Sequence, residues 1–309
     1  MMRLITLLIA ASCTLALCAE NWPPASGKLR VIIDADAANE IDDQYALALA
    51  LGRPDRLQIE GLVAAHYGDH GGRKGIDKSF EEIQRVLSKA GLTGKIPVKR
   101  GVDPIAYKDR PDSSDGIEFI IERAKSATPE DPIWLIMLGP ATDGVVALLR
   151  EPQIADRMIV LWHSRSAWPN QCLNFNAIND TKAARLLFDV KCRLVLFDTG
   201  TNLTIPPEES ERRFAPLGPL GAYLQEIRHR SPHFISPKKG IFDLGDIAAL
   251  LDTNCIKFEK VAAPRVEVSM RYNFDKKGPE IVRIHDVDKD TSFNLLEDAL
   301  RRLQTQTSP

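Results

Sequence analysis

The chain has 309 residues, of which 44% are hydrophobic and 27% are charged, a composition typical of a globular protein with a large core. Its 40 Lys and Arg residues are balanced by 42 Asp and Glu residues, which leaves a formal charge of -2. The sequence therefore lacks the overall positive field that binds nucleic acid or an anionic membrane, and we expect a small-molecule partner. A homo-oligomer is also compatible with this composition.

The N-terminal residues have the three-part form of a secretory signal. Arg3 precedes an apolar stretch from Leu4 to Leu17, and small residues follow near Ala19. This stretch is shorter than the roughly twenty residues that span a bilayer. We therefore expect residues 1–19 to be a signal peptide and residues 20–309 to be an exported single domain, periplasmic or extracellular. Lipidation at Cys18 is the alternative, although Leu17 stands where such signals usually carry a small residue.

Apolar, β-branched runs without alternation predict strands that are buried on both faces of a sheet. They lie at residues 29–34, 59–65, 133–138, 158–162 and 194–197. Helical patterns separate them at residues 79–90, 116–127 and 181–189. Strands that alternate with helices predict a Rossmann-like α/β fold with an open, mainly parallel sheet.

The C-terminal part has a different pattern. Residues 265–272 and 280–284 alternate between apolar and polar side chains, which predicts an antiparallel hairpin. A final helix is expected at residues 293–303. No segment is rich enough in Gly, Ser or Pro to divide the chain, so we expect one domain.

Acidic residues follow the first predicted strand, at the edge where open α/β sheets bind ligands. The segment DADAANEIDD contains five of them: Asp34, Asp36, Glu40, Asp42 and Asp43. Several carboxylates in one cleft disfavour each other's ionisation, and a hard cation such as calcium or magnesium relieves this repulsion. Capping of the helix predicted from Gln44 is the alternative for Asp42 and Asp43.

Four blocks of the sequence resemble the inosine-uridine nucleoside hydrolases. DADAANEIDD is similar to the family's DxDPGxDD but two residues longer between the aspartate pairs, and LGPATD (138–143) is similar to LGPLTN. NFN (174–176) with DTKAA (180–184) resembles EFN and DPEAA, and FDLGDIAALL (242–251) resembles HDPLAVAYLL. The blocks occur in the family's order and indicate a divergent, exported member with a nucleoside-hydrolase-like sheet.

This resemblance implies a calcium-dependent hydrolase that cleaves the N-glycosidic bond of ribonucleosides or related ribosides. Calcium would be bound by Asp36, Asp43, Asp243 and the backbone carbonyl of Leu138, and Asp36 would also be the general base. The residues that match ribose partners are Asp42, Asn170, Asn174 and Asn176. A helix cap for Asp42 and turn positions for the asparagines are the alternatives.

The sequence departs from the family at the leaving group. The histidine that precedes the late aspartate in the family is Phe242 here. His66 and His163 follow predicted strands and are candidates for the missing proton donor. The alternative for both is a hydrogen-bonding role inside the fold.

The sequence leaves two other functions open: a calcium-stabilised sugar- or nucleoside-binding protein without turnover, and a haloacid-dehalogenase-type phosphohydrolase.

Overall fold

A computed structural model describes residues 27–71, 74–232, 236, 238–276 and 278–307. The predicted signal peptide, including Cys18, lies outside these residues. No helix in the described ranges is both long and apolar enough to cross a membrane. Within them, one sheet of eight strands has the order β3-β2-β1-β4-β5-β6-β10-β7. The strands are β1 (Leu29–Ala35), β2 (Leu57–Ala64), β3 (Val98–Arg100), β4 (Ile133–Met137), β5 (Met158–His163), β6 (Arg193–Phe197), β7 (Ile256–Ala262) and β10 (Glu280–Val287).

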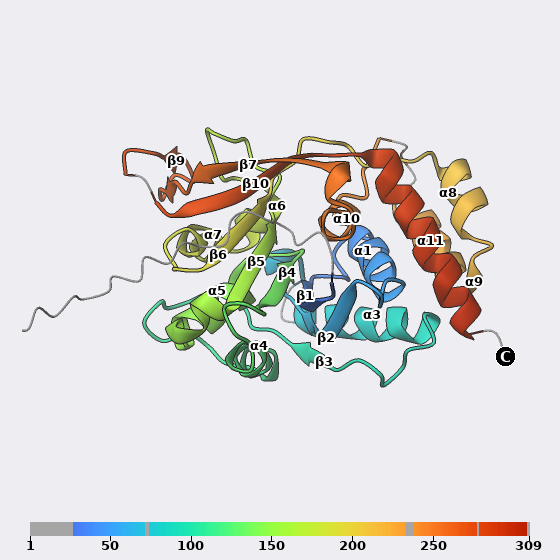
Figure 1. The fold of residues 1–309 in the computed structure, drawn as a ribbon, viewed down its shortest axis with the longest axis horizontal. Coiled ribbons are helices and arrows are strands. Elements are labelled where there is room, and N and C mark those ends of the chain that lie inside the picture. Colours follow the sequence, from blue (N-terminus) through green and yellow to red (C-terminus); the bar gives the residue numbers. More distant parts are fainter. Residues whose placement is uncertain (1–26, 72–73, 233–235, 237, 277, 308–309) are drawn as a thin grey trace, which may run out of the picture.

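Helices connect the strands and cover both faces of the sheet (Figure 1). They are α1 (Asp42–Leu51), α2 (Gly68–Gly71), α3 (Gly75–Lys89), α4 (Asp115–Lys125), α5 (Thr142–Arg150), α6 (Phe175–Asn179), α7 (Thr181–Leu187), α8 (Pro207–Phe214), α9 (Gly218–Arg230), α10 (Leu244–Leu251) and α11 (Lys289–Thr307). Short 3-10 helices lie at Pro152–Arg157 and Thr253–Cys255.

The two faces of the sheet bury separate cores. Ile33 of β1 belongs to the core formed with α1, α3, α9, α10 and α11, whereas its neighbour Ile32 belongs to the core formed with α4, α5 and α7. Successive residues of a strand point to opposite faces, so a strand buried on both sides must be apolar at nearly every position. This requirement explains the unalternating runs in the sequence and confirms the mainly parallel α/β fold.

The antiparallel pair at the C-terminus is present, but the prediction of its first strand was wrong. β10 pairs with β7, not with residues 265–272. Those residues form only the short strands β8 (Arg265–Val266) and β9 (Tyr272–Asn273), which pair with each other. β7 lies at the sheet edge and its middle residues are exposed, so its sequence lacks the apolar pattern of a buried strand.

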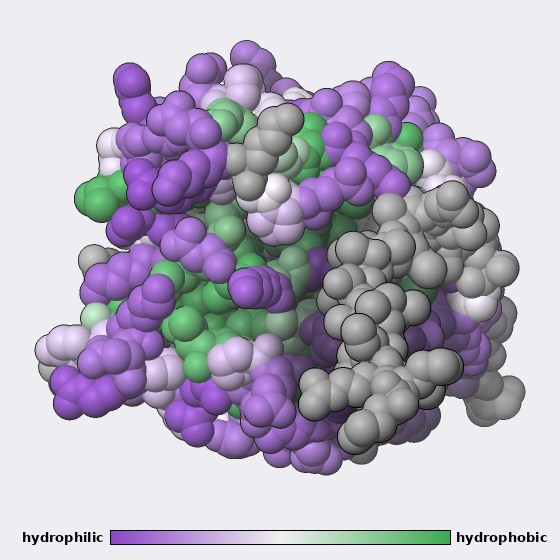
Figure 2. All heavy atoms as spheres, turned by 60° about the vertical axis from the view of Figure 1, so that its left-hand side comes forward, coloured by the Kyte–Doolittle hydropathy of each residue, from purple (hydrophilic) through white to green (hydrophobic). Residues whose placement is uncertain are grey.

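The surface combines charged residues with apolar ones. Figure 2 shows hydrophobic residues gathered in a hollow of one face, with hydrophilic residues around it. Large hydrophobic side chains that are exposed in the described structure include Leu173, Phe175 and Ile178 at and beside α6. The cysteines Cys172, Cys192 and Cys255 are free thiols.

Candidate active site

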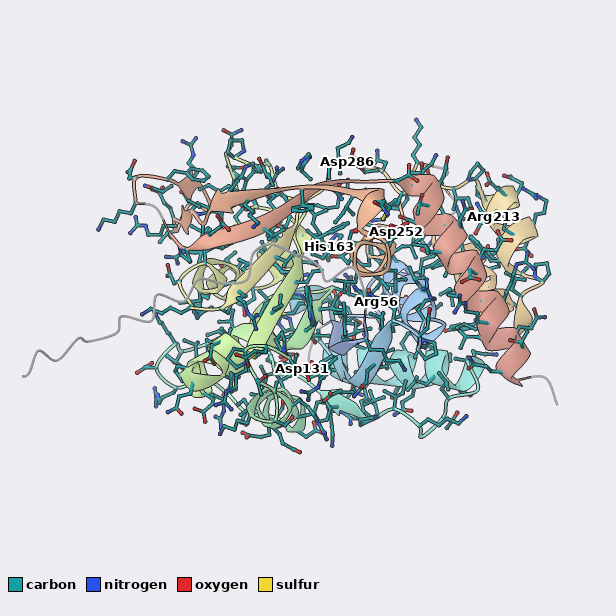
Figure 3. All side chains as sticks on the ribbon, viewed as in Figure 1. Arg56, Asp131, His163, Arg213, Asp252 and Asp286 are labelled. Carbon is teal, nitrogen blue, oxygen red and sulfur yellow. The ribbon has the colours of Figure 1, made fainter. Side chains whose placement is uncertain are left out.

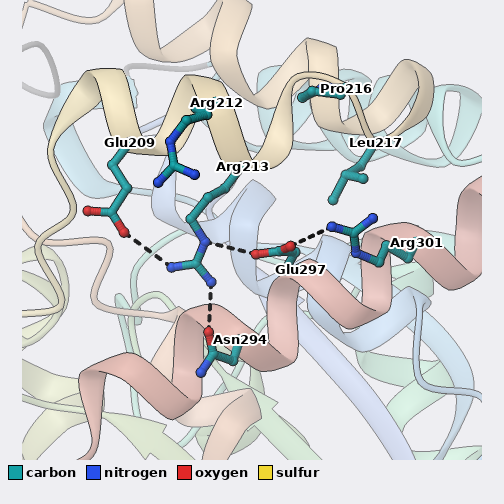
Figure 4. Close-up of a pocket in the computed structure, with 8 residues that line it drawn as sticks. All are labelled: Glu209, Arg212, Arg213, Pro216, Leu217, Asn294, Glu297 and Arg301. Carbon is teal, nitrogen blue, oxygen red and sulfur yellow. Dashed lines mark hydrogen bonds and ion pairs between the residues drawn. The ribbon is translucent and has the colours of Figure 1, made fainter.

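A cavity of about 320 Å³ lies at the carboxyl ends of β1, β4 and β5, where the topology of an open α/β sheet places ligands. Acidic residues dominate its wall: Asp36, Glu40, Asp42, Asp43 and Asp243. A larger cavity of about 500 Å³ lies between α8 and α11 (Figure 4). There Arg213 bonds Glu297 and Asn294 and so ties the two helices together. The chemistry predicted from the sequence therefore belongs to the smaller cavity.

Three carboxylates converge in this cavity from two helices. Ligand oxygens of Asp42, Asp43 and Asp243 all lie within 4.8 Å of one another, and all three residues are buried. Asp42 and Asp43 are the first residues of α1, but Ile41 is its N-cap and no side chain caps the helix there. From the first turn of α1 these carboxylates reach Asp243, while burial raises their pKa values and backbone N–H groups at the start of the helix oppose that rise.

Asp36 completes the acidic wall from the loop after β1. Asn39 donates a hydrogen bond from Nδ2 to Asp36 Oδ2 at 3.1 Å and fixes the orientation of the carboxylate. A Cβ atom at Gly139 would lie 2.8 Å from Asp36 Oδ1, so any larger residue in that turn would displace the carboxylate. This close approach explains the glycine of the LGPATD segment.

Burial and mutual repulsion make these carboxyl groups hard to ionise. Burial first, and then the charge of Asp42, raises the pKa of Asp36 to about 7. Burial and Glu40 raise the pKa of Asp42 to about 6. The pKa values of Asp43 and Asp243 lie well above their usual range, again because of burial and then neighbouring carboxylates. Within the described residues, the buried oxygen Asp43 Oδ1 has no hydrogen-bond partner.

These observations fit a divalent cation. A set of oxygen ligands that contains several carboxylates is the donor set of hard ions, and a bound cation would favour the ionised form of every member. Leu138, directly after β4, also lines the cavity. Asn176 donates from Nδ2 to the Leu138 carbonyl at 2.6 Å and to the His163 carbonyl at 3.1 Å, so it holds the ends of β4 and β5 together.

His163 is the last residue of β5 and lies beside α10 (Figure 3). Its Nδ1 is 2.6 Å from Asp246 Oδ2 and 3.4 Å from Asp243 Oδ1. Asp246 is fully buried, and burial raises its pKa while the adjacent His163 opposes that rise. Sequence reasoning missed Asp246, although its spacing of one helical turn from Asp243 is a signal that could have identified it.

His66 is not among the residues that line the cavity. The backbone N–H of Gly68 donates to its Nδ1 at 2.9 Å, and its Nε2 lies 2.7 Å from Thr142 Oγ1. Because Nδ1 accepts a hydrogen bond, Nε2 carries the ring proton. Burial also lowers the pKa of His66 below its usual value. Both ring nitrogens thus form hydrogen bonds within the fold. This arrangement matches the alternative to a proton donor that the sequence left open for His66.

The asparagines separate into different environments. Asn174 lines the cavity, but its side chain caps α6 by accepting from Ala177 N at 3.0 Å and donates to the Cys172 carbonyl at 2.9 Å. Asn170 does not line the cavity, and its backbone bonds Ala167 and Tyr272. Of the three asparagines predicted to bind ribose, Asn176 alone is both buried and directed into the cavity.

Cations on the opposite wall were not predicted. Arg165 and Lys239 line the cavity, and Lys239 forms an ion pair with Glu40. The guanidinium carbon of Arg165 lies 3.5 Å from the centroid of the Phe242 ring. Arg165 and Phe242 are far apart in the sequence, so neither residue's local pattern indicates this contact.

A second pair of carboxyl groups lies behind the cavity. Asp34 and Asp143 are both fully buried and interact through their side chains. Val102 donates its N–H to Asp143 Oδ1 at 2.9 Å, whereas Asp143 Oδ2 and both Asp34 oxygens find no donor among the described residues. A hydrogen bond between two carboxyl groups needs a proton on one of them. Burial raises the pKa of Asp143 to about 7, and burial and the charge of Asp143 raise that of Asp34 well above its usual range, so the pair holds a proton.

Comparison with known proteins agrees with this site. Residues 31–294 match the family model described as inosine-uridine preferring nucleoside hydrolase. A plant nucleoside hydrolase aligns with a TM-score of 0.70 at 18% identity, over 89% of this chain and 99% of that one. A purine-preferring ribonucleoside hydrolase from Gardnerella vaginalis aligns with a TM-score of 0.68 at 17% identity, over 90% and 100% of the two chains.

An inosine-uridine preferring nucleoside hydrolase from Bacillus anthracis aligns with a TM-score of 0.67 at 15% identity, over 89% of this chain and 99% of that one. At these identities the structural neighbours establish the fold. A search of curated proteins gives no significant match.

Proposed function

Because the chain belongs to the inosine-uridine preferring nucleoside hydrolase family, we propose that its acidic cavity is the active site of a calcium-dependent ribonucleoside hydrolase. The family assignment identifies an N-ribosyl hydrolase and favours this class over a phosphohydrolase or a binding protein without turnover. The observation that carries the proposal is the convergence of buried carboxylate oxygens from Asp42, Asp43 and Asp243 within 4.8 Å.

We assign the metal to Asp43 and Asp243 of the converging group, together with Asp36 and the backbone carbonyl of Leu138; these four residues line the cavity. Asp42, the third converging acid, is assigned to the ribose. Calcium is favoured over zinc because every donor is an oxygen. A bound cation supplies orientation of the ribose hydroxyls and a lower pKa for a nearby water.

Asp36 is the general base in this proposal. Its pKa of about 7 without metal shows that the site destabilises its charge, and a cation nearby would restore the carboxylate that the reaction needs. The water oxygen forms a bond to C1′ while its proton goes to Asp36. The electron pair of the glycosidic bond leaves with the base, through a transition state with oxocarbenium character.

Asp42 and Asn176 are the proposed ribose partners. The Nδ2 of Asn176 is bound to two carbonyls, which leaves Oδ1 to accept a hydrogen bond from a hydroxyl. Asp42 receives one hydrogen bond, from Phe242 N at 3.3 Å, and keeps a carboxylate oxygen for the sugar. Both groups are buried, so their hydrogen bonds to a ribose would form away from competing water.

His163 is the proposed proton donor to the leaving base. Asp246 binds Nδ1 and so fixes the ring, and no residue in the described part of the chain binds Nε2. A carboxylate that accepts from Nδ1–H stabilises the imidazolium form of the ring, and in that form Nε2 carries the proton that is given to the leaving base. His66 lacks such a nitrogen because both of its ring nitrogens are engaged in hydrogen bonds.

Export is proposed separately, from the sequence of residues 1–19.

The experiment is hydrolysis of inosine and uridine, measured as release of the base, after removal of metal with a chelator and reloading with calcium or magnesium. We expect activity to return with calcium and to be lost in Asp36→Asn. Asp109→Asn, which removes an exposed carboxylate outside the cavity, is the matched control. Full activity in metal-free protein would refute the assignment of a metal, and full activity of Asp36→Asn would refute the assignment of the base.

A further inference from the structure

One cation of the cavity has no role in the mechanism given above. Arg165 and Lys239 are the permanently charged basic residues that line the cavity, and Lys239 is paired with Glu40. Arg165 makes no ion pair with a carboxylate in the part of the chain that the structure describes; its side-chain hydrogen bonds go to Thr199 O and Asn202 Oδ1. Burial lowers the pKa of Arg165, and the charges of Asp42, Asp243 and Asp198 oppose this effect without forming an ion pair. A half-buried guanidinium without a direct carboxylate partner can still bind a ligand group that carries negative charge.

The fold holds this guanidinium in a fixed position. Nε of Arg165 donates to the Thr199 carbonyl at 3.2 Å and Nη2 donates to Asn202 Oδ1 at 3.3 Å. The backbone of Arg165 has φ of 50°, a left-handed conformation that is unfavourable for a non-glycine residue and persists only where the surroundings enforce it. Its N–H is bound to the Phe197 carbonyl at 3.3 Å. Arg165 is therefore placed before any ligand arrives.

The position of Arg165 relative to the acids identifies the part of the substrate that it meets. Its guanidinium lies over the ring of Phe242, and Phe242 directly precedes the carboxylate of Asp243. Arg165 and Phe242 line the same cavity as the acids, so a riboside whose sugar is bound by the acids can place its base against these two residues. The guanidinium covers one face of the Phe242 ring, and the N–H groups in the plane of a guanidinium suit the carbonyl oxygens and ring nitrogens of a heterocycle.

We propose that Arg165 is a further catalytic residue, which stabilises the negative charge that develops on the leaving group. This inference rests on the proposed function. When the glycosidic bond breaks, its electron pair remains on the departing base, and the base stays anionic until a proton reaches it. A fixed cation lowers the energy of that anion without transferring a proton.

The test uses Arg165→Met, which removes the charge but keeps an unbranched side chain, and Arg165→Lys, which keeps the charge. Arg212→Met is the matched control, because Arg212 is an exposed arginine that lines only the distant cavity. Substrates are uridine, adenosine, uridine 5′-monophosphate and p-nitrophenyl riboside, and kcat and KM are measured for each with calcium present. Loss of one donor that stabilises developing charge typically lowers kcat about 10² to 10³-fold.

We expect Arg165→Met to lower kcat on uridine by about that factor and to affect p-nitrophenyl riboside far less, because p-nitrophenolate is already a stable anion. Arg165→Lys should restore part of the loss, and added guanidinium ion should restore activity to Arg165→Ala. Since a guanidinium does not titrate near neutral pH, the pH profile of kcat should keep its shape in Arg165→Met.

Equal losses on uridine and p-nitrophenyl riboside would overturn the proposal, because a structural role lowers every rate alike. A loss confined to uridine 5′-monophosphate would also overturn it and would place the recognised charge on the sugar. Wild-type protein that hydrolyses none of these substrates with calcium would refute the proposed function and this inference together. Wild-type activity with an unaffected Arg165→Met would refute this inference alone.

Binding gives a readout that does not depend on turnover. The absorbance of p-nitrophenol reports its ionisation, and wild-type protein should lower the pH at which the bound phenol ionises, relative to Arg165→Met. An identical titration in the two proteins would show that Arg165 does not stabilise an anion in the cavity.

Discussion

Replacement of Asp143 by Asn should stabilise the protein at alkaline pH. Asp143 and Asp34 form a buried carboxyl pair that retains a proton, and the pKa of Asp143 is raised from 3.8 to about 7. The folded state therefore binds more protons than the unfolded state between these values, and stability falls as the pH rises through this range. An asparagine has no charge to lose, so the variant should escape this fall.

The size of the effect follows from the pKa of Asp143. One pKa unit corresponds to about 1.4 kcal/mol, so the fully ionised side chain costs the folded state about 4 kcal/mol at a pH above both values. Between pH 5 and pH 8 the expected change is roughly 3 kcal/mol. The amide preserves the contacts, because its oxygen can accept from the N–H of Val102 and its nitrogen can donate to Asp34.

The assay is urea unfolding of wild type and Asp143→Asn at pH 5 and pH 8, with the difference in unfolding free energy compared at the two values. Acids away from the pair titrate in both proteins and cancel in this difference, whereas Asp34 loses the charge of Asp143 as a neighbour and contributes to it. Asp109→Asn is the control and should show no change with pH. If Asp143→Asn is less stable than wild type at pH 8, or if the difference is the same at both pH values, then the pair does not hold a proton.

Further predictions concern the site itself. Asp36→Asn should keep its circular dichroism spectrum and lose about 10² to 10⁴-fold in kcat on inosine, because the base is lost; an unchanged kcat would contradict that role. Calcium at a hundredfold excess over its Kd should stabilise wild type by about 2.7 kcal/mol in thermal unfolding and leave Asp243→Asn unaffected, and equal shifts would argue against a site at Asp243. His163→Ala should lose about 10² to 10⁴-fold on uridine and retain hydrolysis of p-nitrophenyl riboside. His66→Ala should lower the melting temperature and affect both substrates alike, and selective loss on uridine would identify His66 as the proton donor.

The sequence predicted the strands that are buried on both faces, because burial imposes the same requirement for an apolar side chain at nearly all of their positions. Strands such as β1, β4 and β5 are buried on both faces, so nearly every position is apolar and the pattern is unmistakable. β7 has a different requirement, because its middle residues face water at the sheet edge. Its sequence IKFEKVA mixes charged and apolar residues, and it therefore lacks the unbroken apolar run that identified the buried strands.

In the candidate site, residues that are close together in the sequence were predicted, whereas contacts between distant residues were not. Asp36, Asp42 and Asp43 lie in one short segment after a strand, and their local density was sufficient to predict a cation site. The contact of Asp246 with His163 joins residues 83 positions apart. The contact of Arg165 with Phe242 also joins separate elements. Such pairs are created by the packing of α10 and its preceding loop on the sheet, and a single sequence holds no record of that packing.

The two edges of the sheet bear on how the chain behaves at high concentration. One edge is β3, which is only three residues long and includes Lys99 and Arg100. The other is β7, whose exposed positions include Lys257, Glu259 and Lys260. Short or charged edge strands resist the addition of a strand from another molecule. Aggregation through sheet edges is therefore disfavoured at both ends, and any self-association of this enzyme would have to use its helical or loop surfaces.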